Sequence, residues 1–170
     1  MMKFTGILLI ALSLACPAVG DMGSHVHGKA MMYLVADADK IRIELESPSA
    51  NLVGFEHAPR TGVQKQLLEQ VSRELSEPEL FLEFIGTQCQ PLSVEVEAPY
   101  SAEVNSDSSV HSGFHASYEF KCDNLARFNS VIVTLFERFP GIHGIAVQWI
   151  SSGRQGAELL TGKDNELQMK

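Results

Sequence analysis

The residues of this 170-residue chain that are best suited to chemistry are its six histidines and one glutamate that directly precedes a histidine. They are His25, His27, Glu56, His57, His111, His115 and His143. Imidazole nitrogen and carboxylate oxygen are preferred ligands of Zn2+, which usually takes four of them in a tetrahedron. The chain can therefore bind zinc wherever folding brings three or four of these side chains together.

The segment that carries Glu56 and His57 follows a predicted strand. Apolar and charged residues alternate over 41–46, and Ser47-Pro48 ends this pattern. Residues 49–59 then include three large apolar side chains, which is too many for an ordinary surface loop. We expect packing to hold Glu56 and His57 in a fixed geometry. The alternative is that the apolar residues plug the core while Glu56 and His57 are plain surface residues.

His25 and His27 lie just before a strand predicted over residues 29–35. If the strand extends back over them, their spacing of two puts both imidazoles on one face, about 6–7 Å apart at the backbone. Two imidazoles at that separation can share one metal ion. The alternative is a frayed N-terminal segment in which both side chains are solvated.

The other three histidines differ in their surroundings. His115 alternates with apolar residues of a predicted strand over 114–120, so its side chain should point away from the core. His111 lies about 13 Å from His115 in an extended chain and can join it only if the chain folds back at Gly113. His143 stands between apolar neighbours near a turn, which favours a structural role over metal binding.

The N-terminus has the pattern of a secretory signal peptide over residues 1–20. Lys3 is followed by a short apolar run and by the small-residue cleavage pattern Ala18-Val-Gly20. A spanning helix needs about 20 apolar residues, so we expect cleavage after Gly20 and no membrane span in the mature chain. A lipoprotein processed at Cys16 is the alternative, although the residues before it fit a lipobox poorly.

Removal of the leader leaves residues 21–170, which is the length of one domain. Lys3 is the only charged residue removed, so 12 basic and 21 acidic residues remain and the net charge is −9 with histidine neutral. Nucleic-acid binding needs a basic surface for phosphate contacts, and the scattered Lys and Arg residues do not form one. We therefore expect no nucleic-acid partner.

Two cysteines remain after the leader, Cys89 and Cys122. Exported proteins meet an oxidising compartment, so a disulfide is expected, and a zinc site with two cysteines is the alternative. If residues 92–96 and 114–120 pair as a hairpin, directly opposed residue numbers must have an even sum to keep apolar residues on one face. The numbers of Cys89 and Cys122 have an odd sum, which requires a β-bulge near Pro91 or a less direct pairing.

The periodicity of the whole chain predicts an α+β fold in which a mostly antiparallel sheet carries one main amphipathic helix and short helices. That helix is expected over 61–75, with Val63, Leu67, Leu68, Val71 and Leu75 inward. A short helix is expected over 77–86 and a polar tail from Thr161 onward. Further strands are expected over residues 131–135, 142–150 and 156–160.

Four motifs resemble those of one known family. They are His25-Val-His27-Gly28, the run Glu44-Leu-Glu-Ser-Pro-Ser-Ala-Asn-Leu-Val-Gly-Phe-Glu-His-Ala-Pro59, the strand Phe114-His115-Ala116-Ser117-Tyr118-Glu119-Phe120-Lys121-Cys122, and Leu135-Phe-Glu-Arg-Phe-Pro140. The chain is thereby similar to the ZrgA-like family of periplasmic zinc-binding proteins, which are associated with zinc-import ABC transporters. Members often carry a long His/Asp-rich tract, whereas the corresponding residues 101–113 hold a single histidine here.

The resemblance implies a periplasmic protein that binds Zn2+ and supports zinc acquisition by components of an ABC-type importer. His27, His57 and His115 lie inside the family-like motifs and are the expected zinc ligands, with His25, His111, Glu56 or water completing the shell. No nucleophile elbow, phosphate loop or dinucleotide fingerprint occurs, so we expect no enzyme. The alternatives are a protein-interaction module that binds no metal and a zinc-dependent hydrolase with Glu56 as base.

Overall fold

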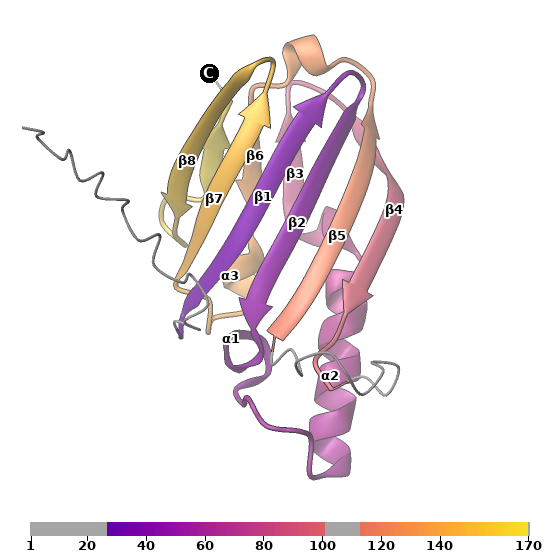
Figure 1. Ribbon diagram of the computed structural model, residues 1–170, viewed down its shortest axis with the longest axis vertical. Helices are drawn as coiled ribbons and strands as arrows, with labels where there is room; N and C mark the ends of the chain where they lie inside the picture. Colours follow the sequence, from indigo (N-terminus) through magenta and orange to yellow (C-terminus); the bar gives the residue numbers. More distant parts are fainter. Residues whose placement is uncertain (1–26, 101–112, 170) are drawn as a thin grey trace, which may run out of the picture.

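The computed structural model describes residues 27–100 and 113–169, which form two β-sheets with short helices at their ends (Figure 1). The larger sheet has six strands in the order β4-β5-β2-β1-β7-β8, and the smaller has three in the order β3-β6-β9. The strands of the larger sheet are β1 (Lys29–Asp37), β2 (Lys40–Pro48), β4 (Cys89–Glu97), β5 (Gly113–Cys122), β7 (Gly144–Ser151) and β8 (Arg154–Leu160).

Strands β1 and β2 correspond to the strands predicted over residues 29–35 and 41–46, and they pair as a hairpin. Asp37 pairs with Lys40 across a turn in which Ala38 has a φ of 54°. Alternate residues of both strands are buried, as the period-two pattern predicts, and Ile41 and Ile43 are completely buried. One face of the hairpin therefore lies in the core, and the charged residues of β2 lie on the other.

The pairing of β4 with β5 confirms the β-bulge that was predicted near Pro91. Cys89 is opposite Cys122 and bonded to it, and the register then shifts between Pro91 and Ser93. This shift is the β-bulge that the odd sum required. Leu92 is the first apolar residue of the strand predicted over 92–96, but the bulge turns its side chain outward, where it is 52% exposed.

The expectation of a mostly antiparallel sheet is confirmed, with one parallel pair at the centre of the larger sheet. Strand β7 runs parallel to β1, with Lys29 opposite Gly144, whereas all other pairs of the larger sheet are antiparallel. Parallel pairing requires a long crossover. Here the chain between β1 and β7 includes β2, β4 and β5 of the larger sheet and β3 and β6 of the smaller one.

The smaller sheet was only partly predicted. Its strands are β3 (Leu82–Ile85), β6 (Ser130–Val133) and β9 (Glu166–Gln168). The prediction of a helix over 77–86 is wrong. Only Pro78–Leu80 forms a single 3-10 turn, η1, and residues 82–85 form β3 instead, because they pair with β6. The polar tail expected from Thr161 contains β9, which pairs with β6 and buries Leu167 completely.

Helix α2 (Gly62–Leu75) agrees closely with the helix predicted from periodicity. The Thr61 hydroxyl accepts a hydrogen bond from the Gln64 amide at 3.2 Å and so caps the helix start. Leu68, Val71 and Leu75 are buried. Val63 was expected in the same stripe but is 74% exposed, because the first turn of the helix extends past the edge of the core.

The core lies between the two sheets. Phe81 and Phe84, before and within β3, pack edge-on against Tyr118 and Phe120 of β5, with ring centroids 6.0 and 4.8 Å apart. The Tyr118 hydroxyl donates to the Leu75 carbonyl at 3.0 Å, which joins α2 to the sheet. In Figure 1 the smaller sheet and α2 lie behind the larger sheet, and no described element covers its front face.

The remaining described helices are short: α1 (Ser49–Val53), α3 (Leu135–Arg138) and the 3-10 turn η2 (Leu125–Arg127). Helix α1 lies at the end of β2 and leads into the Glu56-His57 segment. Within residues 27–100 and 113–169, no helix is long and apolar enough to cross a membrane.

Candidate metal centre

All four histidines of the described ranges belong to one end of the larger sheet, at the bottom of Figure 1. Strands β1, β5 and β7 begin at this end, and β2 and β4 finish there, because Lys29 is opposite Gly144 and Glu97 is opposite His115. His27 precedes β1 and His57 follows α1. His115 is the third residue of β5, and His143 directly precedes β7.

His27 and Glu56 form the closest pair of candidate ligands. The His27 Nε2 atom lies 3.6 Å from the Glu56 Oε1 atom, and their side chains are 74% and 32% exposed. This separation is too long for a good hydrogen bond. It is close to the spacing of about 3.3 Å that two ligands of one tetrahedral zinc ion have when each bond is about 2.0–2.1 Å long.

The Glu56 Oε1 atom is buried and has no hydrogen-bond partner among the described residues. Buried polar atoms almost always have a partner, since losing hydration without compensation is unfavourable. A cation between Glu56 and His27 would satisfy this oxygen. The donor set at this position therefore fits zinc.

A buried asparagine fixes the His27 side of the pair. The Asn51 Oδ1 atom accepts from the Gly28 amide at 2.7 Å, and Nδ2 donates to the Lys29 carbonyl at 2.9 Å. Asn51 belongs to α1, so it ties the start of β1 to the segment that carries Glu56. Sequence reasoning did not identify this role; the only available signal was a lone amide within an apolar run.

Two hydroxyl groups fix the Glu56 side. Tyr100 donates to the Glu56 carbonyl at 2.5 Å, and Ser49 donates to the Phe55 carbonyl at 2.7 Å. Leu52 and Phe55 pack against the core, and the prediction that this segment is held by packing is confirmed. Tyr100 was missed, because it lies 44 residues from Glu56 in sequence.

His57 is held in an orientation that leaves one ring nitrogen available. Its Nδ1 atom lies 2.9 Å from the Ala58 carbonyl, and its ring stacks on Phe55 at 5.1 Å between centroids. A carbonyl oxygen can only accept, so Nδ1 carries the hydrogen. In the neutral ring Nε2 then has a free lone pair, which is the arrangement of a metal ligand backed by a carbonyl.

His115 points away from the core, as its parity predicted, and stands between two carboxylates. It is opposite Glu46 of β2 and Glu97 of β4 on the outer face. Neither glutamate has an ion pair with a described residue. Farther along the same strands the reverse holds: hydrogen bonds from Lys40 and then Arg42 hold the pKa of Glu119 below its ordinary value.

The predicted ligands are thus near one another at one sheet end without forming a closed cluster. Among the described residues, no three His, Cys, Asp or Glu side chains are arranged to hold a metal ion. His27 is paired with Glu56, while His57 and His115 stand apart from that pair. His25 and His111 lie outside the described residues. The alternative of a two-cysteine zinc site is wrong, since both thiols are used in the disulfide.

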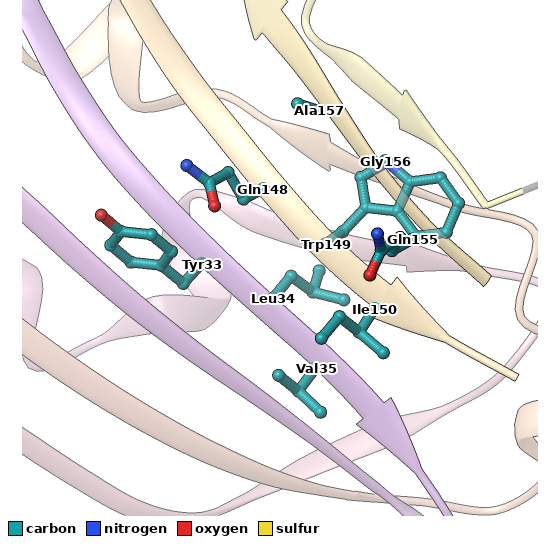
Figure 2. A pocket seen from close by; sticks show the side chains of 9 residues that line it. All are labelled: Tyr33, Leu34, Val35, Gln148, Trp149, Ile150, Gln155, Gly156 and Ala157. Atoms are coloured by element: carbon teal, nitrogen blue, oxygen red, sulfur yellow. The ribbon is translucent and has the colours of Figure 1, made fainter. Parts of the chain in front are cut away.

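An apolar hollow on the larger sheet lies away from the histidines. Its volume is about 480 Å³, and Figure 2 shows it over the later parts of β1 and β7 and the first part of β8. Tyr33, Val35, Gln148 and Ile150 are among the lining side chains, and none of the lining residues is charged. None of the lining residues is a His, Cys, Asp or Glu, so the hollow is not the candidate metal centre.

Fold and site define a β-rich protein in which one end of the main sheet presents histidines and carboxylates. The sequence matches the family described as ZrgA family zinc uptake protein over residues 24–169. The chain therefore belongs to the ZrgA family of zinc uptake proteins, and the resemblance of the four motifs is confirmed. A comparison with curated proteins finds no match.

Proposed function

We propose that this protein binds Zn2+ in the periplasm through histidines and supports zinc acquisition by an ABC-type importer. The observation that carries the proposal is the unpartnered, buried Glu56 Oε1 atom 3.6 Å from the His27 Nε2 atom. Membership of a zinc uptake family supports zinc over other divalent ions.

The proposed ligands are His27, His57 and His115, with Glu56 beside His27. His57 supports this role through the Nε2 atom that its Nδ1 contact leaves available, and His115 through its outward position between Glu46 and Glu97, which form no ion pair with a described residue. His25, His111 or water would complete the shell. The ligands come from segments that meet only in the folded chain, so zinc affinity should depend on folding.

The site is suited to a metal that is carried rather than one that holds the fold together. His27 is mostly exposed, so an ion can enter and leave from solvent. The core, helix α2 and the disulfide connect the strands without any metal. We propose no catalysis, since in this proposal Glu56 binds the zinc ion and is not free to act as the base of a hydrolase.

A calorimetric zinc titration of the metal-free mature chain tests the proposal. The parent should bind zinc, and His57→Ala should bind at least tenfold more weakly, which corresponds to about 1.4 kcal/mol. Glu158→Gln on β8 is the matched control, since its exposed carboxylate lies outside the site. Absence of any binding heat by the parent would favour the metal-free interaction module. Turnover of a generic ester by the zinc-loaded parent would favour the hydrolase.

A further inference from the structure

The side chain of His143 has surroundings that differ from those its sequence suggested. The backbone amides of His143 and Gly144 both donate to the Gly28 carbonyl, at 2.7 and 3.0 Å. Gly28 directly follows His27. The backbone of His143 is therefore fixed beside the segment that carries the His27 ligand.

The imidazole ring of His143 lies over Gly28. A Cβ atom built on Gly28 would be 2.7 Å from the His143 Nδ1 atom and 3.2 Å from Cγ. Adjacent Cα atoms are about 3.8 Å apart and a Cα–Cβ bond is about 1.5 Å long, so this Nδ1 atom lies within about 8 Å of the His27 Cα atom. A histidine side chain that starts from this Cα atom can turn toward the His143 ring, so the two imidazoles can be brought to one metal ion.

A purely structural role does not explain this position. The side chain of His143 is exposed, and its ring has no hydrogen bond to any described residue. The ring thus covers Gly28 but forms no bond with a described residue that would fix the turn. The turn is instead fixed by backbone contacts: Gly141 packs so closely on the Asn51 carbonyl that an added Cβ atom would be 2.4 Å from it.

Asn51 consequently organises both sides of the same small region. Its side chain positions Gly28, and its carbonyl lies against the turn that leads to His143. Helix α1, which contains Asn51, also leads into the Glu56 segment. His27, Glu56 and His143 are therefore held by one common support, although they come from three distant parts of the chain.

We propose that His143 is a zinc ligand that acts with His27 and Glu56. This inference rests on the proposed function and extends it to a side chain outside the motifs that predicted the other ligands. Two imidazoles and one carboxylate provide three protein ligands for zinc, and the fourth position stays open for water or another donor. Because no three described donors are already grouped around one point, the exposed His143 ring must turn toward the His27–Glu56 pair when zinc binds.

Nitrogen NMR of the histidine side chains during zinc titration tests this directly. In the 15N-labelled mature chain, the ring nitrogens of His143 should shift to metal-bound values together with those of His27. His143→Ala should lower zinc affinity at least tenfold and leave the thermal midpoint of the metal-free protein unchanged. His143→Gln, which keeps a polar side chain of similar reach, separates loss of the ligand from loss of contact with Gly28.

The outcomes distinguish this inference from the proposed function. If the parent binds no zinc at all, the proposed function fails and the inference fails with it. If the parent binds zinc while the His143 ring signals stay unmoved and His143→Ala binds like the parent, only the present inference is overturned. In that case the spectra would identify which other histidines are the ligands.

Discussion

At the scale of single residues, Glu56 stands out because its position is unfavourable for stability. One carboxylate oxygen is shielded from water and has no partner among the described residues, although the segment around it is fixed by Tyr100 and Ser49. Uncompensated polar atoms of this kind are uncommon in native proteins. The cost is understandable if the oxygen has a partner in the loaded protein, namely the zinc ion that His27 also faces.

Glu56→Gln should therefore separate function from stability. The amide has the same shape but no charge, so zinc affinity should fall at least tenfold, or about 1.4 kcal/mol. The free energy of unfolding of the metal-free protein should stay the same or rise, since the shielded Oε1 position no longer carries part of a charge. Calorimetry and urea unfolding measure the two quantities. A variant that binds zinc like the parent would contradict the role of Glu56, and Glu158→Gln serves as the control.

A second residue-scale prediction concerns Gly28. Its φ of +81° disfavours any side chain, and an added Cβ would also meet the His143 ring at 2.7 Å. Gly54 has the same φ but no atom within 4 Å of an added Cβ. Gly54→Ala should thus cost about 1 kcal/mol of stability through backbone strain alone, and Gly28→Ala should cost more. Only Gly28→Ala should also weaken zinc binding, because it displaces His143.

Both glycine variants can be compared by urea unfolding and zinc titration. Equal losses of stability would mean that the His143 ring moves aside freely. Equal zinc affinities would contradict the placement of His143 beside the metal.

At the scale of elements, local patterns predicted what local contacts decide. Period-two alternation located β1, β2 and β5, and the three- and four-residue spacing located α2. The odd sum of the cysteine numbers predicted the bulge between Pro91 and Ser93 without any structure. The outward direction of His115 followed from the same parity.

Elements whose existence depends on distant partners were not predicted. Strand β9 is three residues long and gains its stability from pairing with β6, so nothing in its own sequence distinguishes it from a tail. Residues 82–85 became a strand for the same reason. The roles of Asn51 and Tyr100 also depend on bonds across 23 and 44 residues, which no single stretch of sequence reveals.

The disulfide prediction belongs to this scale, because the bond joins β4 to β5 across 33 residues of sequence. In the chain-entropy account, its loss should lower the free energy of unfolding by about 3–4 kcal/mol. Zinc affinity should change little, since Cys89 and Cys122 lie at the opposite end of the strand pair from His115. Unfolding and zinc titration of the double variant Cys89→Ser with Cys122→Ser test both statements. A large loss of zinc affinity would show that the two ends of the pair are coupled.

At the scale of the whole molecule, the larger sheet has two different ends. One end is closed covalently by the disulfide, and the other is assembled from segments that precede β1, follow β2 and precede β7. Noncovalent contacts alone hold the second end together, among them the hydrogen bonds of Asn51 and Tyr100. An ion that binds there would connect these segments and supply a cross-link that the free protein lacks.

Zinc should for this reason stabilise the entire fold. Binding to the folded chain alone adds about 2.7 kcal/mol when free zinc is one hundred times the dissociation constant. For a chain of this size each 1 kcal/mol shifts the thermal midpoint by about 2–4 °C, so the expected rise is roughly 5–11 °C. Scanning calorimetry of the mature protein with and without zinc measures the rise, and a chelator should reverse it. The Cys89→Ser with Cys122→Ser variant should show a similar rise from a lower starting point, whereas Glu56→Gln at the same zinc concentration should show a smaller one. An equal rise in the parent and in Glu56→Gln would mean that zinc stabilises the protein from some other position, and the end of the sheet that holds Glu56 would not be the metal centre.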